Sequence, residues 1–158
     1  MELTYHTDYS FRVLIYLGLR AGSLCQIADI AEHYSISRNH LVKVVHHLAQ
    51  GGFVSTFRGK GGGVTLARDP ATINVGKVVR YSEGPMRLVE CFRGPGRQCA
   101  ISQACTLAGI FNEAAESFLA TLDRYSLADL LVNQRRLARI LQIPAETSAR
   151  SEIPRRLI

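Results

Sequence analysis

Apolar residues recur with helical spacing in the first fifty positions and predict three helices. From Asp8 to Arg20 they fall at intervals of three and four residues, with Thr7 as the expected N-cap. The same spacing predicts a short helix over residues 26–33 and a third helix that follows Ser37 and ends near Gln50, before two glycines. These segments predict a compact three-helix unit.

The spacing then changes, and residues 53–67 predict a β-hairpin. Two short runs, 53–57 and 64–67, flank the glycine-rich turn Arg58-Gly59-Lys60-Gly61-Gly62-Gly63. Three helices followed by such a hairpin are typical of a winged helix. We therefore predict a mainly α fold with a small β-hairpin, in which residues 1–82 form a winged helix-turn-helix domain.

The second half of the chain predicts a long helix after an irregular segment. A short helix is expected over 74–82, and the long one runs from Gln103 to about Tyr125. Its apolar stripe consists of Leu107, Ile110, Phe111, Ala114, Phe118 and Leu122. Ser126 and Asp129 predict a fresh cap for a shorter helix from Leu127 to Leu141. A helix this long needs a second surface to cover it, so we expect a homodimer joined through it. Residues 103–141 would then be the dimerisation helix and the C-terminal helix, and 142–158 a flexible tail.

Charge and composition narrow the classes of partner. The 158 residues carry 19 Lys and Arg against 13 Asp and Glu, a formal charge of +6 that favours a polyanion such as nucleic acid. The N-terminus lacks the pattern of a signal peptide, and no apolar run approaches the roughly 20 residues that span a bilayer. We expect a cytoplasmic protein that makes no membrane contact.

The residues expected to contact double-stranded DNA lie at the start of the third helix and in the hairpin turn. Arg suits guanine edges and Asn suits adenine edges, so Arg38 and Asn39 are candidates for reading bases. Each residue alone could be an ordinary solvated group, and the ordered combination favours DNA binding. The full set is Ser37, Arg38, Asn39, His40 and Lys43 in the helix, with Arg58 and Lys60 in the turn. His46 and His47 are expected at the surface, without a role.

Three cysteines, Cys91, Cys99 and Cys105, lie in or beside the irregular segment. Their wide spacing fits zinc poorly, because zinc sites usually contain closely spaced pairs and four ligands. An iron-sulfur cluster accepts thiolates from a looser loop, which makes residues 83–105 a candidate cluster-binding loop. Structural cysteines and a thiol redox switch remain alternatives. Cys25 has apolar neighbours and is expected to be a buried small residue.

Several stretches of the chain resemble the NsrR family of nitric-oxide-responsive repressors, in a superfamily of winged-helix regulators that includes IscR and RirA. The resemblance extends to about Leu131 and is most specific at residues 5–9, 37–43, 58–63, 117–123 and 127–130 and at the three cysteines. It implies a homodimer joined through the long helix, repression of nitrosative-stress genes, and loss of repression when nitric oxide attacks the cluster.

The resemblance also implies the ligand set. Cys91, Cys99 and Cys105 would hold the cluster, 4Fe-4S in preference to 2Fe-2S, and Asp8 of the partner subunit would be the fourth ligand. Asp8 could instead simply stabilise the first turn of its helix through the helix dipole. Ala108 stands where IscR is expected to have a histidine ligand, which disfavours a role in cluster assembly.

Two other functions remain open at this point. The first is a regulator that responds to iron or redox state through the same cluster. The second is a cluster-containing redox enzyme or electron carrier, which the basic hairpin argues against. The sequence contains no evident Ser-His-Asp set or phosphate-binding loop, so we do not expect an enzyme.

Overall fold

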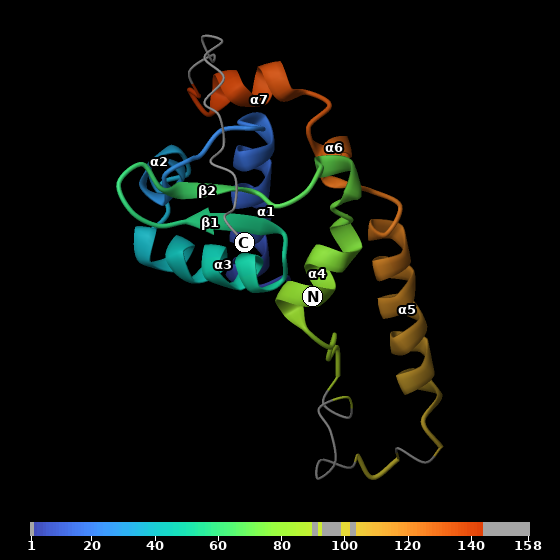
Figure 1. Ribbon diagram of the computed structural model, residues 1–158. Coiled ribbons are helices and arrows are strands. Elements are labelled where there is room, and N and C mark those ends of the chain that lie inside the picture. The colour runs from blue at the N-terminus through green and yellow to red at the C-terminus, as the bar shows by residue number, and fades with distance from the viewer. Residues whose placement is uncertain (1, 90–91, 93–98, 102–103, 144–158) are drawn as a thin grey trace.

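The computed structural model of the protein describes residues 2–89, 92, 99–101 and 104–143 (Figure 1). Within these residues the elements are, in order, α1 (Tyr5–Leu19), α2 (Ile27–His33), α3 (Arg38–Gln50), β1 (Val54–Phe57), β2 (Gly63–Leu66), the 3-10 helix η1 (Pro70–Thr72), α4 (Val75–Glu83), α5 (Thr106–Leu122), α6 (Leu127–Leu130) and α7 (Gln134–Ile140). The predicted fold class, mainly helical with one hairpin after three helices, is confirmed.

Helix α1 begins three residues before the predicted start. Its N-cap is Thr4, whose hydroxyl accepts a hydrogen bond from the Thr7 amide at 3.4 Å. Thr7 is buried inside the first turn, so the prediction that it caps the helix is wrong. Both threonines suit an N-cap. The Glu83 carboxylate decides between them, because it holds Thr4 through the Thr4 amide at 2.8 Å and hydroxyl at 2.9 Å.

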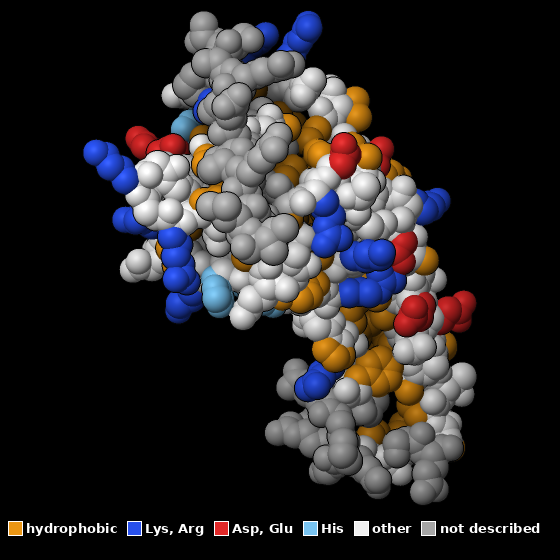
Figure 2. Space-filling model, viewed as in Figure 1, with side chains coloured by type: hydrophobic (Ala, Val, Ile, Leu, Met, Phe, Trp, Pro, Cys, Tyr) orange, Lys and Arg blue, Asp and Glu red, His pale blue; other side chains and the backbone are white. Residues whose placement is uncertain are grey.

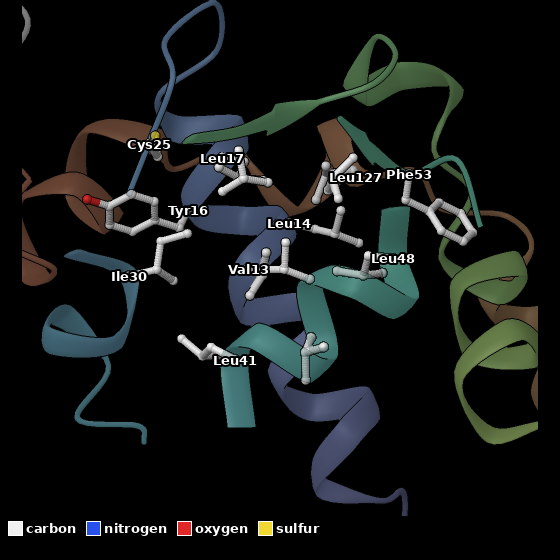
Figure 3. Packing of buried hydrophobic residues seen from close by; sticks show 14 of the residues in the cluster. Val13, Leu14, Tyr16, Leu17, Cys25, Ile30, Leu41, Leu48, Phe53 and Leu127 are labelled. Atoms are coloured by element: carbon white, nitrogen blue, oxygen red, sulfur yellow. The ribbon is translucent and has the colours of Figure 1, made fainter. Parts of the chain in front are cut away.

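The hydrophobic core lies where α1 packs against α3 and the hairpin (Figure 3). Leu14 and Leu17 project from α1 into this core and are almost completely buried. Cys25 lies in the same cluster and is 4% exposed, as expected for a small apolar residue. Around them pack side chains from each neighbouring element, among them Ile30, Leu41, Leu48, Phe53, Val64 and Leu127. The core therefore joins the three helices, the hairpin and α6 into one unit.

The hairpin is a two-stranded antiparallel sheet that begins with the pair Val54 and Leu66 and ends with Phe57 and Gly63. Val64 also pairs with Cys25 in an isolated β-bridge, with backbone hydrogen bonds of 2.8 and 2.9 Å. This bridge fastens the returning strand to the segment just before α2. Strand β2 of this hairpin, which we call the wing, is thus held by backbone contacts on both sides.

Helix α5 stands to one side of the helical unit and packs against α4 (Figure 1). It begins at Thr106 and ends at Leu122, inside the predicted range from Gln103 to Tyr125. Its end is set by a tertiary contact, because the Tyr125 carbonyl accepts a hydrogen bond from the Val75 amide at 2.9 Å. The chain is thereby drawn into an extended path beside the start of α4, where a helix cannot continue.

The predicted helix from Leu127 to Leu141 is in fact two helices, α6 and α7, so its predicted continuity is wrong. The predicted cap is present, because the Asp129 carboxylate accepts hydrogen bonds from the Ser126 amide and hydroxyl, each at 2.7 Å. The break follows from close packing, since a Cβ atom on Gly18 would lie 2.5 Å from the side chain of Leu131. Leu131 therefore seats α6 on α1 and turns the chain.

The last described residues return to the core. Ile143, within the range expected to be a tail, is 8% exposed, and its amide donates to the Ala138 carbonyl at 2.9 Å. The rest of the predicted tail, residues 144–158, lies outside the described residues.

Candidate nucleic-acid interface and cysteine site

Helices α2 and α3 are joined by a tight turn that fixes their relative orientation. Ser35 adopts a φ of 52°, in the left-handed region, and Ile36 is buried with its amide donating to the Ala31 carbonyl at 2.9 Å. Ser37 occupies the N-cap position of α3 and is exposed, and its side chain makes no capping hydrogen bond. The Ser37 hydroxyl is therefore exposed at the helix start and does not cap α3.

The predicted DNA-contacting residues lie on the exposed side of α3. The opposite side of the helix, made of Leu41, Val44, Val45 and Leu48, is buried in the core. The exposed side chains of α3 include Arg38, Asn39, His40 and Lys43. Burying one face of α3 thus presents its polar N-terminal residues outward, which is the arrangement a recognition helix needs.

The wing presents two further cations. Arg58 and Lys60 are exposed in the turn between β1 and β2, where Gly59 and Gly61 have φ values of 93° and 83° that favour glycine. The Gln26 side-chain amide donates a hydrogen bond to the Gly62 carbonyl. This contact ties the turn to the start of α2, so the basic turn is held against the helices.

The start of α3 and the wing turn lie at the same edge of the molecule (Figure 1). They border one hollow of about 230 Å³, lined by residues that include Gln26, Arg38, Thr56, Gly59, Gly62 and Gly63. Lys and Arg side chains project at this edge in the space-filling view (Figure 2). The structure therefore brings both predicted groups of DNA-contacting residues together.

Replacing Gly63 with alanine is expected to loosen the wing. A Cβ atom there would lie 2.7 Å from the Cys25 carbonyl oxygen, a backbone atom that can yield only if the β-bridge opens. We expect the free energy of unfolding in urea to fall by about 1–3 kcal/mol. Gly109→Ala is the matched control, since a Cβ there meets no atom within 4 Å, and it should gain about 0.5–1 kcal/mol. Equal stability of both variants would contradict this account.

Two of the three candidate ligand cysteines are described, and both can reach the surface. Cys99 is exposed, and Cys105 is half-buried at the N-cap position of α5, where its side chain makes no capping hydrogen bond. Neither is in a disulfide. Cys91 lies outside the described residues. In the part of the chain that is described, no group of three or more His, Cys, Asp or Glu side chains is placed to hold a metal ion.

The two described thiols fit a thiolate-ligated cluster. Both described thiols are accessible and uncommitted to the core, unlike Cys25, which is buried beneath the wing. Cys105 also lies at the positive end of the α5 dipole, which favours anionic groups. A hollow of about 580 Å³ lies beside the end of α4, where the chain leads toward the cysteines. The residues that line it include Glu2, Leu3, Glu83, Met86, Leu88 and Phe111. Thiolates of this kind suit iron-sulfur clusters.

Asp8 lies in the first turn of α1 and is committed to an ion pair within its own helix. Its carboxylate oxygen is 2.7 Å from the Arg12 guanidinium, and the two side chains are 45% and 40% exposed. Arg12 also lies over the ring of Tyr34, 5.8 Å from its centroid, next to the turn that leads into α3. The Asp8 carboxylate is accessible from outside, and an external ligand would compete with Arg12 for it.

Both His46 and His47 were expected at the surface without a role; His46 is exposed, whereas His47 is half-buried and has partners. The His47 Nδ1 atom lies 2.8 Å from Nε2 of His6, and its ring stacks on Tyr81. Burial lowers the pKa of His6, His47 lowers it further, and Glu83 opposes them. A weak signal was available, because His47 lies one position from the buried Leu48 on α3. Only the fold, however, could bring His6 to it.

Glu83, beside the start of α1, is a second polar residue that the sequence pattern did not single out. Burial raises its pKa, but the hydroxyls of Thr7 and Thr4 and the Thr4 amide outweigh this effect, so the pKa lies below its usual value. The Thr7 hydroxyl is buried and has no hydrogen-bond partner within the ordinary distance and angle limits. Glu83 therefore joins the end of α4 to the start of α1 as an anion.

Helices α4 and α5 are joined at one end by polar contacts. Arg80 donates two hydrogen bonds to the Asp123 carboxylate, at 2.6 and 2.7 Å, which lower the pKa of Asp123. Asn74 donates to the Asp123 carbonyl at 2.7 Å. The other end of α5 carries the exposed apolar residues Leu107 and Ile110, 55% and 56% exposed. Figure 2 shows apolar side chains gathered between this helix and α4.

Comparisons with known proteins agree with this description. The chain is similar to the Rrf2 family, described as an iron-dependent transcriptional regulator, over residues 3–133. It is 49% identical over 144 residues to the HTH-type transcriptional regulator NsrR of Bacillus subtilis, which covers 90% of this chain and 99% of that protein.

Two solved structures are similar in fold. A transcriptional regulator from Listeria innocua is 27% identical with a TM-score of 0.66, over 83% of this chain and 86% of that chain. IscR of T. potens is 23% identical with a TM-score of 0.66, over 87% of this chain and 90% of that chain. At this identity the IscR likeness concerns the fold alone. Among the described residues, no helix has both the length and the apolar character needed to cross a membrane.

Proposed function

Because the chain belongs to the Rrf2 family of transcriptional regulators, we propose that it is a repressor that binds operator DNA as a homodimer and senses nitric oxide through an iron-sulfur cluster. The expected resemblance to the NsrR family is confirmed by the curated relatives, which are named as regulators and not as enzymes. The observation that carries the DNA-binding part is the convergence of the α3 start and the glycine-rich wing at one edge.

The two groups of residues at this edge have different tasks. Arg38 and Asn39, at the N-terminus of α3, enter the major groove and read base edges. Ser37, His40 and Lys43 hold phosphates beside them, and Arg58 and Lys60 reach the backbone or minor groove from the wing. The formal charge of +6 supports this assignment, since neutralising phosphates dominates the affinity for DNA.

Alanine variants should separate these tasks. Lys43→Ala and Arg58→Ala are expected to weaken binding to every DNA sequence and to reduce the slope of log affinity against log salt by about one unit. Arg38→Ala and Asn39→Ala should instead cost about 1–3 kcal/mol at particular operator positions. Fluorescence anisotropy on operator and scrambled DNA at several salt concentrations measures both effects. An unchanged slope with lost discrimination for Lys43 or Arg58 would reverse their assignment.

The cysteine site supplies the sensing part of the proposal. Cys91, Cys99 and Cys105 would hold a 4Fe-4S cluster, and its iron would offer nitric oxide a place to bind. Three thiolates leave one iron without a protein sulfur, and we assign that place to Asp8 of the partner subunit. The support is that Asp8 is accessible and shares its carboxylate with Arg12 alone among the charged side chains described.

The regulation follows from what Asp8 can pair with. Bound to iron, its carboxylate would be withdrawn from Arg12, and the start of α1 would be fastened to the cysteine loop of the other protomer. Released, the carboxylate returns to Arg12. A ligand shifts such an equilibrium only through its different affinity for the two states. The cluster-bound state must therefore favour the spacing of the two α3 helices that fits the operator.

An iron-responsive regulator is the second candidate, and the description of the Rrf2 family as iron-dependent favours it. Such a regulator would use the same residues to contact DNA and to hold the cluster, but its signal would be iron and not nitric oxide. Visible absorption and operator affinity, measured after iron chelation and after nitric oxide under anaerobic conditions, distinguish the two. Release of DNA at stoichiometric nitric oxide supports the first candidate, and release on mild chelation alone supports the second.

A further inference from the structure

Three helices meet at a polar contact that we name the histidine junction, formed by His6 of α1, His47 of α3 and Tyr81 of α4. His6 Nε2 and His47 Nδ1 are 2.8 Å apart. The His47 ring stacks on Tyr81 with 4.3 Å between centroids and 21° between planes, and the Tyr81 hydroxyl donates to the His47 carbonyl at 3.0 Å. All three side chains are half-buried. The junction therefore has both directional bonds and close packing.

The junction lies between the proposed sensing residues and the recognition helix. His6 is in the same turn of α1 as Asp8, and it follows Thr4, which is held by Glu83. Glu83 is the last residue of α4, two positions after Tyr81, and the chain continues from it into the segment that contains Cys91. His47 is in the last turn of α3. A displacement of either the α1 start or the α4 end therefore acts directly on α3.

The geometry of α3 would carry such a displacement to DNA. The helix is continuous over 13 residues, and its buried side packs rigidly in the core. With a rise of about 1.5 Å per residue, His47 lies roughly 13 Å along the helix from Arg38. A hydrogen bond between two imidazoles needs one ring nitrogen as donor and the other as acceptor, so it is sensitive to their relative position. Tilting α3 at this end moves the residues that face the groove.

We propose that His6 and His47 are a positioning pair that couples the recognition helix to the start of α1 and the end of α4, and so transmits the state of the cysteine site to DNA. This inference rests on the proposed cluster-dependent function. Neither histidine is among the residues assigned to DNA or to the cluster, and the pair acts by holding α3 at one angle. Tyr81 supports it by stacking on His47 and by bonding to its backbone.

The test uses full-length dimers, isolated anaerobically with their cluster and again after its removal. His6→Leu deletes the hydrogen bond, and His6→Gln keeps an amide nitrogen near the Nε2 position. His46→Leu, on the exposed neighbour of His47, is the control. Operator affinity at fixed salt is measured for both forms of each protein, and circular dichroism verifies folding. If His6→Leu unfolds, His47→Leu takes its place as the variant that deletes the bond, and His47→Asn, which keeps a donor near Nδ1, takes the place of His6→Gln.

We expect the ratio of affinities with and without the cluster to be at least tenfold in the unmodified protein and the control. It should fall below about threefold in His6→Leu and return in His6→Gln. Equal loss of affinity in both forms of His6→Leu, with the ratio kept, would make the pair merely structural and overturn the inference. The inference would also be overturned if His6→Leu bound the operator as tightly as the unmodified protein in both forms and so kept the full affinity ratio. Equal affinities in the two forms of the unmodified protein would instead overturn the proposed switch, and this inference with it.

Discussion

Removing the cluster is expected to lower operator affinity at least tenfold, about 1.4 kcal/mol, while the protein remains a folded dimer. Cys99→Ala and Cys105→Ala should each lose the cluster, because the remaining thiolates cannot replace a ligand, and nitric oxide should have the same effect on DNA binding. The fold survives because neither thiol belongs to the core. Iron and sulfide content, visible absorption, size-exclusion chromatography and anisotropy at fixed salt measure the result.

Cys25→Ala is the matched control for this experiment. The side chain of Cys25 is 4% exposed and packs in the core of the helical unit (Figure 3), so the variant should keep its iron, its sulfide and its response to nitric oxide. A Cys99→Ala protein with full iron and sulfide would remove the cluster from the proposal. Equal operator affinity of the intact, cluster-free and nitric-oxide-treated forms would leave a DNA-binding protein without this switch.

A charge on the apolar side of α5 is expected to separate the dimer and to lower operator affinity by about 100-fold or more. Ile110 is 56% exposed in the single chain, and the neighbouring Leu107 is 55% exposed, so a second copy can bury both. Ile110→Asp would place an unpaired charge in that contact. A monomer contacts only one half-site, which forfeits the gain from linking two binding events. Sedimentation and operator binding measure the two effects together.

Ala120→Asp provides the control, because it adds the same charge at an exposed position on a different side of the same helix. Both variants should keep the helical unit folded, since the α5 residues buried against the rest of the chain are Ala115 and Leu119. The control should remain dimeric and bind the operator normally. If Ile110→Asp also remained a dimer with full affinity, the dimer interface would have to be sought on another surface.

Much of the proposed DNA-contacting surface could be predicted from local patterns. The exposed positions of Arg38, Asn39 and Lys43 follow from the helical period of α3, because burying its apolar residues leaves these side chains outside. The wing follows from the switch to alternating spacing around a run of glycines. The sequence did not reveal that Gln26 ties the wing turn to α2 or that Gly63 lies against the Cys25 backbone. Those contacts join segments about forty residues apart.

The amino-acid sequence alone determined which segments of this protein are helices or strands and which residues face the core, because hydrophobic periodicity is a local property. The tertiary structure decided where the elements begin and end and which polar groups meet. Glu83 selects Thr4 over Thr7 as the cap of α1, and Leu131 divides the predicted last helix by packing on Gly18. The fold likewise brings His6 to His47 across 41 residues of sequence. Such pairings depend on which buried surfaces pack together, and no local spacing encodes that choice.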